Sequence, residues 1–235
     1  MSRLAPEDEI ERVREVYARY EDQRLAERRW DPANAGNRQM SVERRAAISR
    51  VLSDMVVPHH PRFLEVGCGT GAYAGFVGSL LGPATTTAVG IDLLMDPIAR
   101  GRAISSQVNF ALADGRRLPF ADDRFDLVLL FTVLSSIRDS EDRRAAADEV
   151  WRVLKPGGYV VCYDLRYPVP YNRNVARISR GEVARLLPGE ISGGPLTVLP
   201  VLARSLGRGA SRLYPLLNRL TWLRSHLLLV IQKPQ

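Results

Sequence analysis

The chain has 235 residues, of which 46% are hydrophobic and 25% are charged, and it contains two cysteines. These proportions are typical of a globular protein and exclude a disordered chain and a disulfide-rich scaffold. The longest apolar run, residues 227–231, is too short to cross a bilayer, and the first ten residues are acidic rather than signal-like. The sequence therefore predicts a cytoplasmic enzyme or binding domain.

The formal net charge is +7, and it comes almost entirely from arginine, since Lys155 and Lys233 are the two lysines. From Arg166 onward, Glu182 and Glu190 are the acidic residues among ten arginines and Lys233. This basic C-terminal third favours a solvated surface or a site for an anionic small molecule. Nucleic acid or an anionic membrane is the alternative partner.

The first part of the chain predicts two helices. Residues 7–29 repeat apolar side chains near helical spacing, and residues 30–37 contain Pro, Gly and Asn, which break helices. A second helix is expected from Ser41, as its N-cap, to Met55, before Pro58 and Pro61.

The pattern then changes to short apolar runs that alternate with helical stretches. Strands are expected at 63–66, 87–91, 108–112, 125–131 and 159–165, and helices at 72–81, 97–105 and 140–154. This alternation predicts βαβ units around a mainly parallel sheet. In the last third we expect a helix at 179–187, a strand or helix start at 196–203, a helix at 213–223 and a strand at 226–232.

The turn after the first strand carries the strongest functional pattern. Gly67, Gly69 and Gly71 follow Glu65 and precede a helix, so a ligand can approach the backbone there without meeting side chains. The N–H groups at the start of the helix face the same place. The next strand ends at Asp92, whose carboxylate can accept hydrogen bonds from both hydroxyls of a ribose.

Three further segments complete an ordered set. They are Ala113-Asp114-Gly115 after the third strand, Phe125-Asp126-Leu127-Val128 in the fourth, and Leu154-Lys155-Pro156-Gly157-Gly158 before the fifth. With the glycine-rich turn, this set closely resembles the class I S-adenosylmethionine-dependent methyltransferases over residues 62–165. The resemblance implies a Rossmann-like α/β fold with seven strands, mainly parallel, of which the last is antiparallel. It also implies a helical extension or lid at 1–61 and a methyltransferase domain at 62–235.

The same resemblance implies S-adenosylmethionine as the cofactor and assigns residues to it. Glu65, Gly67, Gly69 and Gly71 would form the loop around its methionine part, and Asp92 would hold the ribose. The adenine would lie against Leu93, Asp114 and Gly115, and the methionine part would also lie near the backbone of Phe131.

Other functions fit the residues less well. A short-chain dehydrogenase shares the glycine-rich turn but needs Tyr-x-x-x-Lys, and Trp151 and Leu229 occupy the tyrosine's place before the two lysines. Methylation of RNA or protein is an alternative, although no Asn-Pro-Pro-Tyr-type motif follows the fourth strand. A non-catalytic module that binds the cofactor is the third possibility. We expect no nucleic-acid partner and no metal.

The acceptor is expected to be a small polar or anionic molecule, methylated on a hydroxyl of a sugar or natural product, by analogy with the family. Where many family members carry a histidine after the fourth strand, this chain has Ser135. The candidate bases are Asp164, at the end of the fifth strand, and His226. His59 and His60 are expected on the surface. The candidate substrate residues are Tyr17, Arg38, Arg166, Tyr167 and Tyr171.

Two segments have two interpretations each. The N-terminal helices are either a lid, lined by Tyr17, Tyr20, Trp30, Asn37 and Arg38, or an amphipathic layer that buries its apolar side. Residues 206–223 are either a crossover helix or a basic amphipathic helix that binds a membrane or a lipid-linked substrate, and the crossover is favoured.

Overall fold

The computed structural model describes residues 11–16, 31–82, 86–168, 172 and 174–235. Tyr17, Tyr20, Trp30 and Tyr171, which the sequence proposes for a lid or a substrate site, lie outside these residues. The chain divides into two compact units. The first consists of residues 1–48 and 195–226, and the second of residues 49–194 and 227–235. The predicted boundary between residues 61 and 62 stays a prediction.

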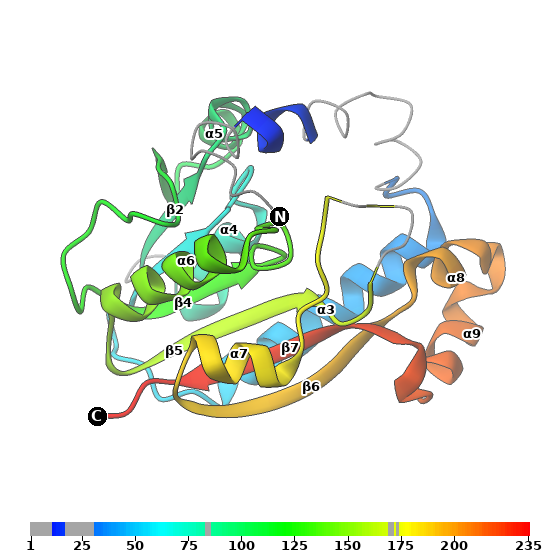
Figure 1. The fold of residues 1–235 in the computed structure, drawn as a ribbon. Helices are drawn as coiled ribbons and strands as arrows, with labels where there is room; N and C mark the ends of the chain where they lie inside the picture. Colours follow the sequence, from blue (N-terminus) through cyan, green and yellow to red (C-terminus); the bar gives the residue numbers. More distant parts are fainter. Residues whose placement is uncertain (1–10, 17–30, 83–85, 169–171, 173) are drawn as a thin grey trace. The chain divides into compact units, whose positions relative to one another are not determined.

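A seven-stranded sheet in the order β3-β2-β1-β4-β5-β7-β6 runs through the fold (Figure 1). Its first five strands are β1 (Arg62–Val66), β2 (Thr87–Asp92), β3 (Val108–Leu112), β4 (Phe125–Phe131) and β5 (Leu154–Leu165). Every neighbouring pair among these five is parallel. The Rossmann-like α/β fold expected from the sequence is therefore confirmed.

The last two strands, β6 (Glu190–Val198) and β7 (Arg224–Gln232), run antiparallel to each other. Gly189 lies against the backbone of Gln232, and Gly193 lies against that of Leu228, so one strand ascends as the other descends. The chain after β7 returns along the start of β5, where the N–H of Lys233 donates to the carbonyl of Gly158. The antiparallel last strand is thus also confirmed.

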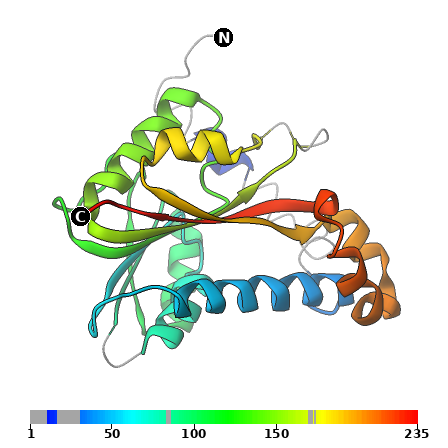
Figure 2. The same ribbon diagram turned by 90° about the horizontal axis from the view of Figure 1, so that it is seen from below.

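Helices cover both faces of the sheet in the second unit. They are α4 (Ala72–Leu81), α5 (Met95–Ile104), α6 (Ser140–Val153) and α7 (Arg180–Leu186). Figure 2 shows α6 (green) and α7 (yellow) on one face, with α4 and α5 on the other. All seven residues of β4 are buried, as its apolar run from Leu127 to Phe131 predicts for a central parallel strand.

The connections reverse direction between β1 and β4. From β1 the chain proceeds through α4 to β2 and β3, whereas from β4 it proceeds through α6 to β5, on the other side of the sheet. In open parallel sheets such a reversal leaves a crevice outside the carboxyl ends of the two strands. The turn after β1 and the segment after β4 meet there, since a Cβ on Gly67 would lie 3.0 Å from the side chain of Val133.

The first unit contains most of α3 (Ala35–Ser53), together with α8 (Pro200–Ser205), η1 (Gly207–Gly209), α9 (Ala210–Leu217) and η2 (Thr221–Leu223). Its core is built from Met40, Val198, Ala203 and Tyr214. A Cβ at Gly36 would lie 2.0 Å from the carbonyl oxygen of Ala203, so the close approach of α3 and α8 requires glycine there.

The prediction that Ser41 caps the second helix is wrong, because α3 begins at Ala35. The side chain of Asn34 accepts a hydrogen bond from the N–H of Asn37 at 3.1 Å, and Asp31 accepts one from Ala33 at 2.7 Å. Asn34 therefore caps the first turn of α3, while Asp31 holds the loop before the helix. The helix therefore continues through Gly36 and Asn37, which the sequence pattern treats as breakers.

The last third also departs from the predicted ranges. The strand β6 begins at Glu190 rather than near 196, and the residues from 200 onward are helical. Position 193 inside β6 requires glycine, because a Cβ there would lie 2.2 Å from the carbonyl oxygen of Leu228. The helix expected at 213–223 ends at Leu217 and is followed by η2. None of the helices in the described ranges has the length and apolar character needed to span a membrane.

Candidate active site

The turn after β1 has a backbone that favours glycine. Gly67, Gly69 and Gly71 have φ angles of 65°, 54° and 71°, in the left-handed region where a Cβ is disfavoured. A Cβ on Gly69 would meet no heavy atom within 4 Å, so this glycine faces open space. Gly69 is therefore the point where a ligand can approach the backbone.

Gly71 has a different role from Gly69. A Cβ on Gly71 would lie 2.6 Å from the ring of Phe110 in β3, and one on Gly101 of α5 would lie 2.7 Å from the same ring. The Phe110 ring thus occupies the space that two side chains would need. Gly71 also precedes α4 as its N-cap. Its absence of a side chain serves the packing of α4 and α5 on the sheet.

Glu65 is buried in β1 and caps α4 from below. Its Oε2 accepts a hydrogen bond from the N–H of Ala74 at 2.7 Å, one of the first N–H groups of the helix, which have no partner within the helix. Burial raises the pKa of Glu65 to about 8, the bond from Ala74 opposes this rise, and the nearby charge of Asp92 adds to it. Glu65 therefore joins β1 to the start of α4 and fixes the ends of the glycine-rich turn between them.

Asp92 ties the end of β2 to the glycine-rich turn. Its Oδ2 accepts from the N–H of Gly69 at 2.8 Å, and its Oδ1 accepts from that of Leu94 at 3.0 Å. Burial raises the pKa of Asp92, and these N–H bonds counter the rise. A carboxylate has about four acceptor positions, so capacity remains for two ribose hydroxyls. Leu93, the next residue, is half-buried.

Asp114, in contrast, is already engaged. Its two oxygens accept from the guanidinium and the backbone N–H of Arg116, at 2.6 to 3.1 Å. The same guanidinium also reaches Asp142 of α6 at 2.9 Å. The amino group of an adenine would therefore have to share the Asp114 oxygens with Arg116. Gly115 packs near Val66, since a Cβ there would lie 3.1 Å from that side chain.

The end of β4 completes the crevice with aromatic side chains. The ring of Phe131 makes edge contacts with Tyr73 of α4, at 4.8 Å between centroids, and with Tyr163 of β5, at 6.3 Å. The next residue, Thr132, has a φ of 58°, which is uncommon for a β-branched residue. Such strain often accompanies functional sites. No pattern in the sequence indicates this backbone conformation or the contact between Phe131 and Tyr73.

The segment after β4 is held by Asp164, one of the candidate bases. Asp164 is buried at the end of β5, and its oxygens accept from the N–H of Ser135 at 3.1 Å and of Leu165 at 2.8 Å. Burial raises the pKa of Asp164 to about 6, and hydrogen bonds from Ser135 and the backbone restrain the rise. Ser135, in the place of the family's histidine, is itself fully buried.

Other residues that the sequence singles out lie elsewhere in the second unit. Arg166 and Tyr167 are half-buried after β5, with the guanidinium stacked 4.9 Å from the tyrosine ring centre. Asp126 stands at the start of β4, where it binds the Lys155 ammonium at 2.7 Å and the N–H of Arg62 at 2.8 Å. It therefore fixes the edge of the sheet opposite the crevice. His59 and His60 are exposed, as expected.

His226, the second candidate base, belongs to the first unit. It is 8% exposed, and its Nδ1 lies 2.8 Å from the hydroxyl of Ser225, which donates to the carbonyl of Thr197 at 3.1 Å. Burial, with a further contribution from the nearby Arg44 cation, lowers the pKa of His226 to about 3. The imidazole is therefore neutral at physiological pH.

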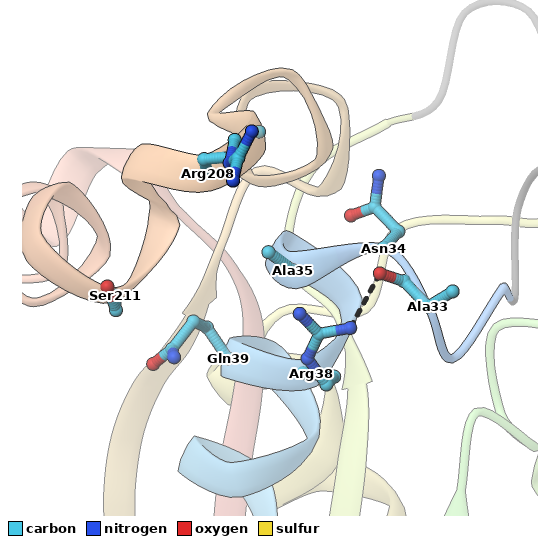
Figure 3. A pocket seen from close by; sticks show the side chains of 8 residues that line it. Ala33, Asn34, Ala35, Arg38, Gln39, Arg208 and Ser211 are labelled. Atoms are coloured by element: carbon cyan, nitrogen blue, oxygen red, sulfur yellow. Dashed lines mark hydrogen bonds between the residues drawn. The ribbon is translucent and has the colours of Figure 1, made fainter.

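A cavity of about 510 Å³ lies in the first unit, between the start of α3 and the η1–α9 segment (Figure 3). Its polar lining is formed by Asn34, Arg38, Gln39, Arg208 and Ser211. Arg38, a candidate substrate residue, donates to the carbonyls of Pro32 at 3.1 Å and Ala33 at 2.5 Å, so the loop before α3 holds it. Arg208 reaches the cavity from the opposite side. Within the described ranges, no group of three or more His, Cys, Asp or Glu is placed to bind a metal ion.

Comparison with known proteins adds the family. Residues 64–162, from the middle of β1 to a point within β5, match the model of a methyltransferase domain. The match covers less than half of the chain, and over these residues the chain is similar to methyltransferase domains. This confirms the resemblance stated from the sequence, and with it S-adenosylmethionine as the family's cofactor.

A curated relative is the demethylmenaquinone methyltransferase of Staphylococcus aureus, 36% identical over 122 residues. The match spans 51% of this chain and 49% of the relative, so the chain spans about half the length of the curated relatives it matches.

Solved structures share the fold of this methyltransferase domain at low identity. The 1,6-didemethyltoxoflavin-N1-methyltransferase of Burkholderia thailandensis, solved with S-adenosylhomocysteine, superposes with a TM-score of 0.64 at 16% identity. It covers 100% of this chain and 93% of its own. The cyclase SpnF superposes with a TM-score of 0.56 at 20% identity, over 80% and 81% of the two chains. The fold therefore accommodates more than one kind of reaction.

Proposed function

We propose that this protein transfers a methyl group from S-adenosylmethionine to a small-molecule acceptor. The observation that carries the proposal is the bond between the Asp92 carboxylate and the Gly69 N–H. It brings a carboxylate that would hold the ribose together with an open glycine backbone, beside one of the two strands where the connections reverse direction. The residues fit the cofactor at both places, because Gly69 leaves space for it and Asp92 retains acceptor capacity.

In this proposal each residue has a limited task. Bound S-adenosylmethionine supplies an electrophilic methyl group on a sulfonium, and the protein aligns the acceptor and excludes water. Gly67, Gly69 and Gly71 leave room for the methionine part, with the backbone of Phe131 on the other side. Asp92 holds the ribose and Leu93 packs on the adenine. Asp114 and Gly115 lie at the adenine edge, where Asp114 contributes less because Arg116 occupies its oxygens.

The acceptor is proposed to be a polar or anionic small molecule, methylated on a hydroxyl of a sugar or natural-product scaffold. The names of the relatives support a small molecule, since they refer to demethylmenaquinone and 1,6-didemethyltoxoflavin. The ten arginines from Arg166 onward, set against two acidic residues, support a polar or anionic group. Arg166 and Tyr167 stay candidates for acceptor contacts from the second unit.

The acceptor hydroxyl loses its proton as its oxygen bonds to the methyl carbon, and the carbon–sulfur bond breaks to leave S-adenosylhomocysteine. Asp164 is the first candidate to receive that proton, because its raised pKa of about 6 makes it a stronger base than an ordinary aspartate. Neutral His226 is the second candidate. The roles of both residues remain proposals.

The test is transfer of the labelled methyl group of S-adenosylmethionine to three acceptor pools: hydroxylated metabolites, total RNA and unfolded protein. Label in the metabolite pool, with an equal amount of S-adenosylhomocysteine, is expected. Methylation of RNA would favour the alternative that the basic C-terminal third suggests. Cofactor binding without transfer to any pool would contradict an activity of this kind. The cytoplasmic location expected from the sequence stays a prediction, which cell fractionation tests.

A further inference from the structure

Large apolar side chains are exposed along the segment from α8 to η2 in the first unit. Their exposed fractions are 46% for Leu213, 55% for Leu216, 42% for Leu220 and 64% for Trp222. Isolated exposed leucines are ordinary, but here four large side chains stand within ten residues. Together with Arg212 and Arg219, these four residues are called the α9 face below.

The opposite side of α9 already packs on the core of its own unit. Ala210 and Tyr214 are buried, and the Tyr214 hydroxyl donates to the carboxylate of Glu43 at 2.5 Å while it accepts from the N–H of Val198 at 3.2 Å. These bonds fix the rotation of the helix. Leu213 and Leu216, three residues apart, therefore stay on its outer side.

The charges on the α9 face are all positive. Arg212 is exposed one helical turn before Leu216 in α9, and Arg219 is exposed in the turn that follows the helix. No acidic residue follows Glu190 in the sequence, so the segment contains no carboxylate to neutralise them. The face thus combines apolar side chains, a tryptophan and two arginines that have no acidic residue in their own segment.

We propose that the α9 face binds the surface of an anionic lipid bilayer. Arginines bind the acidic headgroups, while leucines and tryptophan enter the boundary with the acyl chains. A nucleic acid would use the arginines but would leave the leucines in water, so the apolar side chains favour the bilayer. The inference is independent of the methyl acceptor, because it concerns where the protein binds and not what it methylates.

The test is sedimentation of the full chain with vesicles, using phosphatidylcholine with phosphatidylserine, and phosphatidylcholine alone. We expect binding to the anionic vesicles that weakens with salt. Arg212→Gln with Arg219→Gln should weaken it about fivefold for each arginine. Leu216→Gln with Trp222→Gln should also weaken it, although the charge is unchanged. The matched controls, Arg50→Gln with Arg124→Gln and Val56→Gln, alter exposed residues of the second unit and should bind as the wild type does.

Circular dichroism shows whether each variant is folded, and only folded variants are compared. Equal sedimentation of the wild type with and without anionic vesicles would overturn the proposal. So would vesicle binding that the α9-face variants and the controls reduce equally. Retention on RNA that the arginine variant loses and the Leu216→Gln, Trp222→Gln variant keeps, without vesicle binding, would assign the face to nucleic acid instead.

Discussion

The Asp92 carboxylate accepts a hydrogen bond from the N–H of Gly69 at 2.8 Å, across the gap between the end of β2 and the turn after β1. The two residues are 23 positions apart in the sequence. The bond holds the glycine-rich turn in place before any ligand arrives. A preorganised turn loses less entropy when it binds a ligand.

Asp92 is the first residue to alter. We expect Asp92→Ala to weaken S-adenosylmethionine binding about tenfold to hundredfold, because charge-assisted hydrogen bonds contribute about 1.5–3 kcal/mol. Asp92→Asn should weaken it less, since the amide keeps one acceptor oxygen. Calorimetric titration measures both. The exposed Asp96, in the first turn of α5, gives the matched control Asp96→Asn, which should bind normally. Normal binding by Asp92→Ala would refute the site.

Two glycines of one turn should respond differently to alanine. Gly69→Ala should lower the free energy of unfolding by about 1 kcal/mol, from its positive φ, but should block ligand approach. Gly71→Ala should lower it by about 3 kcal/mol, because its Cβ would also press on Phe110. Urea unfolding and calorimetric titration separate the two effects. Equal losses of stability would contradict the assignment of different roles to the two residues.

Glu65 should make the second unit less stable as pH rises. Its pKa is raised from 4.5 to about 8, so the folded state holds its proton more tightly than the unfolded state does. The resulting stabilisation is complete below pH 4.5 and is lost as pH rises to about 8, with a size on the order of a few kcal/mol. Glu65→Gln should flatten this slope in urea unfolding curves, while the exposed Glu190→Gln should leave it as it is.

His226 should have the opposite pH dependence. Its pKa is lowered from 6.5 to about 3, so its contribution to stability is complete above pH 6.5 and is lost as pH falls towards 3. His226→Gln cannot take up the proton and should reduce the acid-induced loss. Unfolding by urea between pH 4 and 7, monitored at about one-unit steps, checks this. The exposed His59→Gln is the control, and an unchanged slope in His226→Gln would show that the imidazole titrates normally.

Asp164 should reveal its role in a pH profile. If it takes the proton of the acceptor, kcat of the wild type rises with pH through about 6, and we expect Asp164→Asn to lose that rise. Its bonds to Ser135 and Leu165 also hold the segment after β4, so melting temperatures are measured beside the rates. A variant with a lower melting temperature but an unchanged profile would restrict Asp164 to positioning.

The sequence predicts the central sheet well for a physical reason. A strand covered on both faces is a nearly continuous apolar run, as in β4, which begins and ends at the predicted residues. The edge strand β3 also has the predicted bounds, although Asn109 and Leu112 in it are exposed. The order of Glu65, the three glycines and Asp92 likewise predicts the candidate site, because these residues lie at strand ends. The order of residues in the sequence therefore predicts the part of the candidate site that lies in the turns directly after β1 and β2.

The remainder depends on contacts between distant segments. The bond from Ser135 to Asp164 joins residues 29 positions apart, and the start of α3 depends on side chains that cap it from the preceding loop. The glycine pattern cannot distinguish Gly69, which faces open space, from Gly71, which faces a ring. The ion pair between Arg116 and Asp114 is not predicted by the sequence either, although only two positions separate the residues.

The ring of Phe110 lies where both Gly71 and Gly101 would carry a side chain. The Phe110 ring therefore fills the space next to both glycines, and neither glycine can gain a side chain while this ring is present. In the evolution of this chain, a larger residue at 71 or 101 is expected only after position 110 has become smaller. Sequences of close relatives should show that correlated exchange, and an engineer who wishes to reshape the turn has to begin in β3.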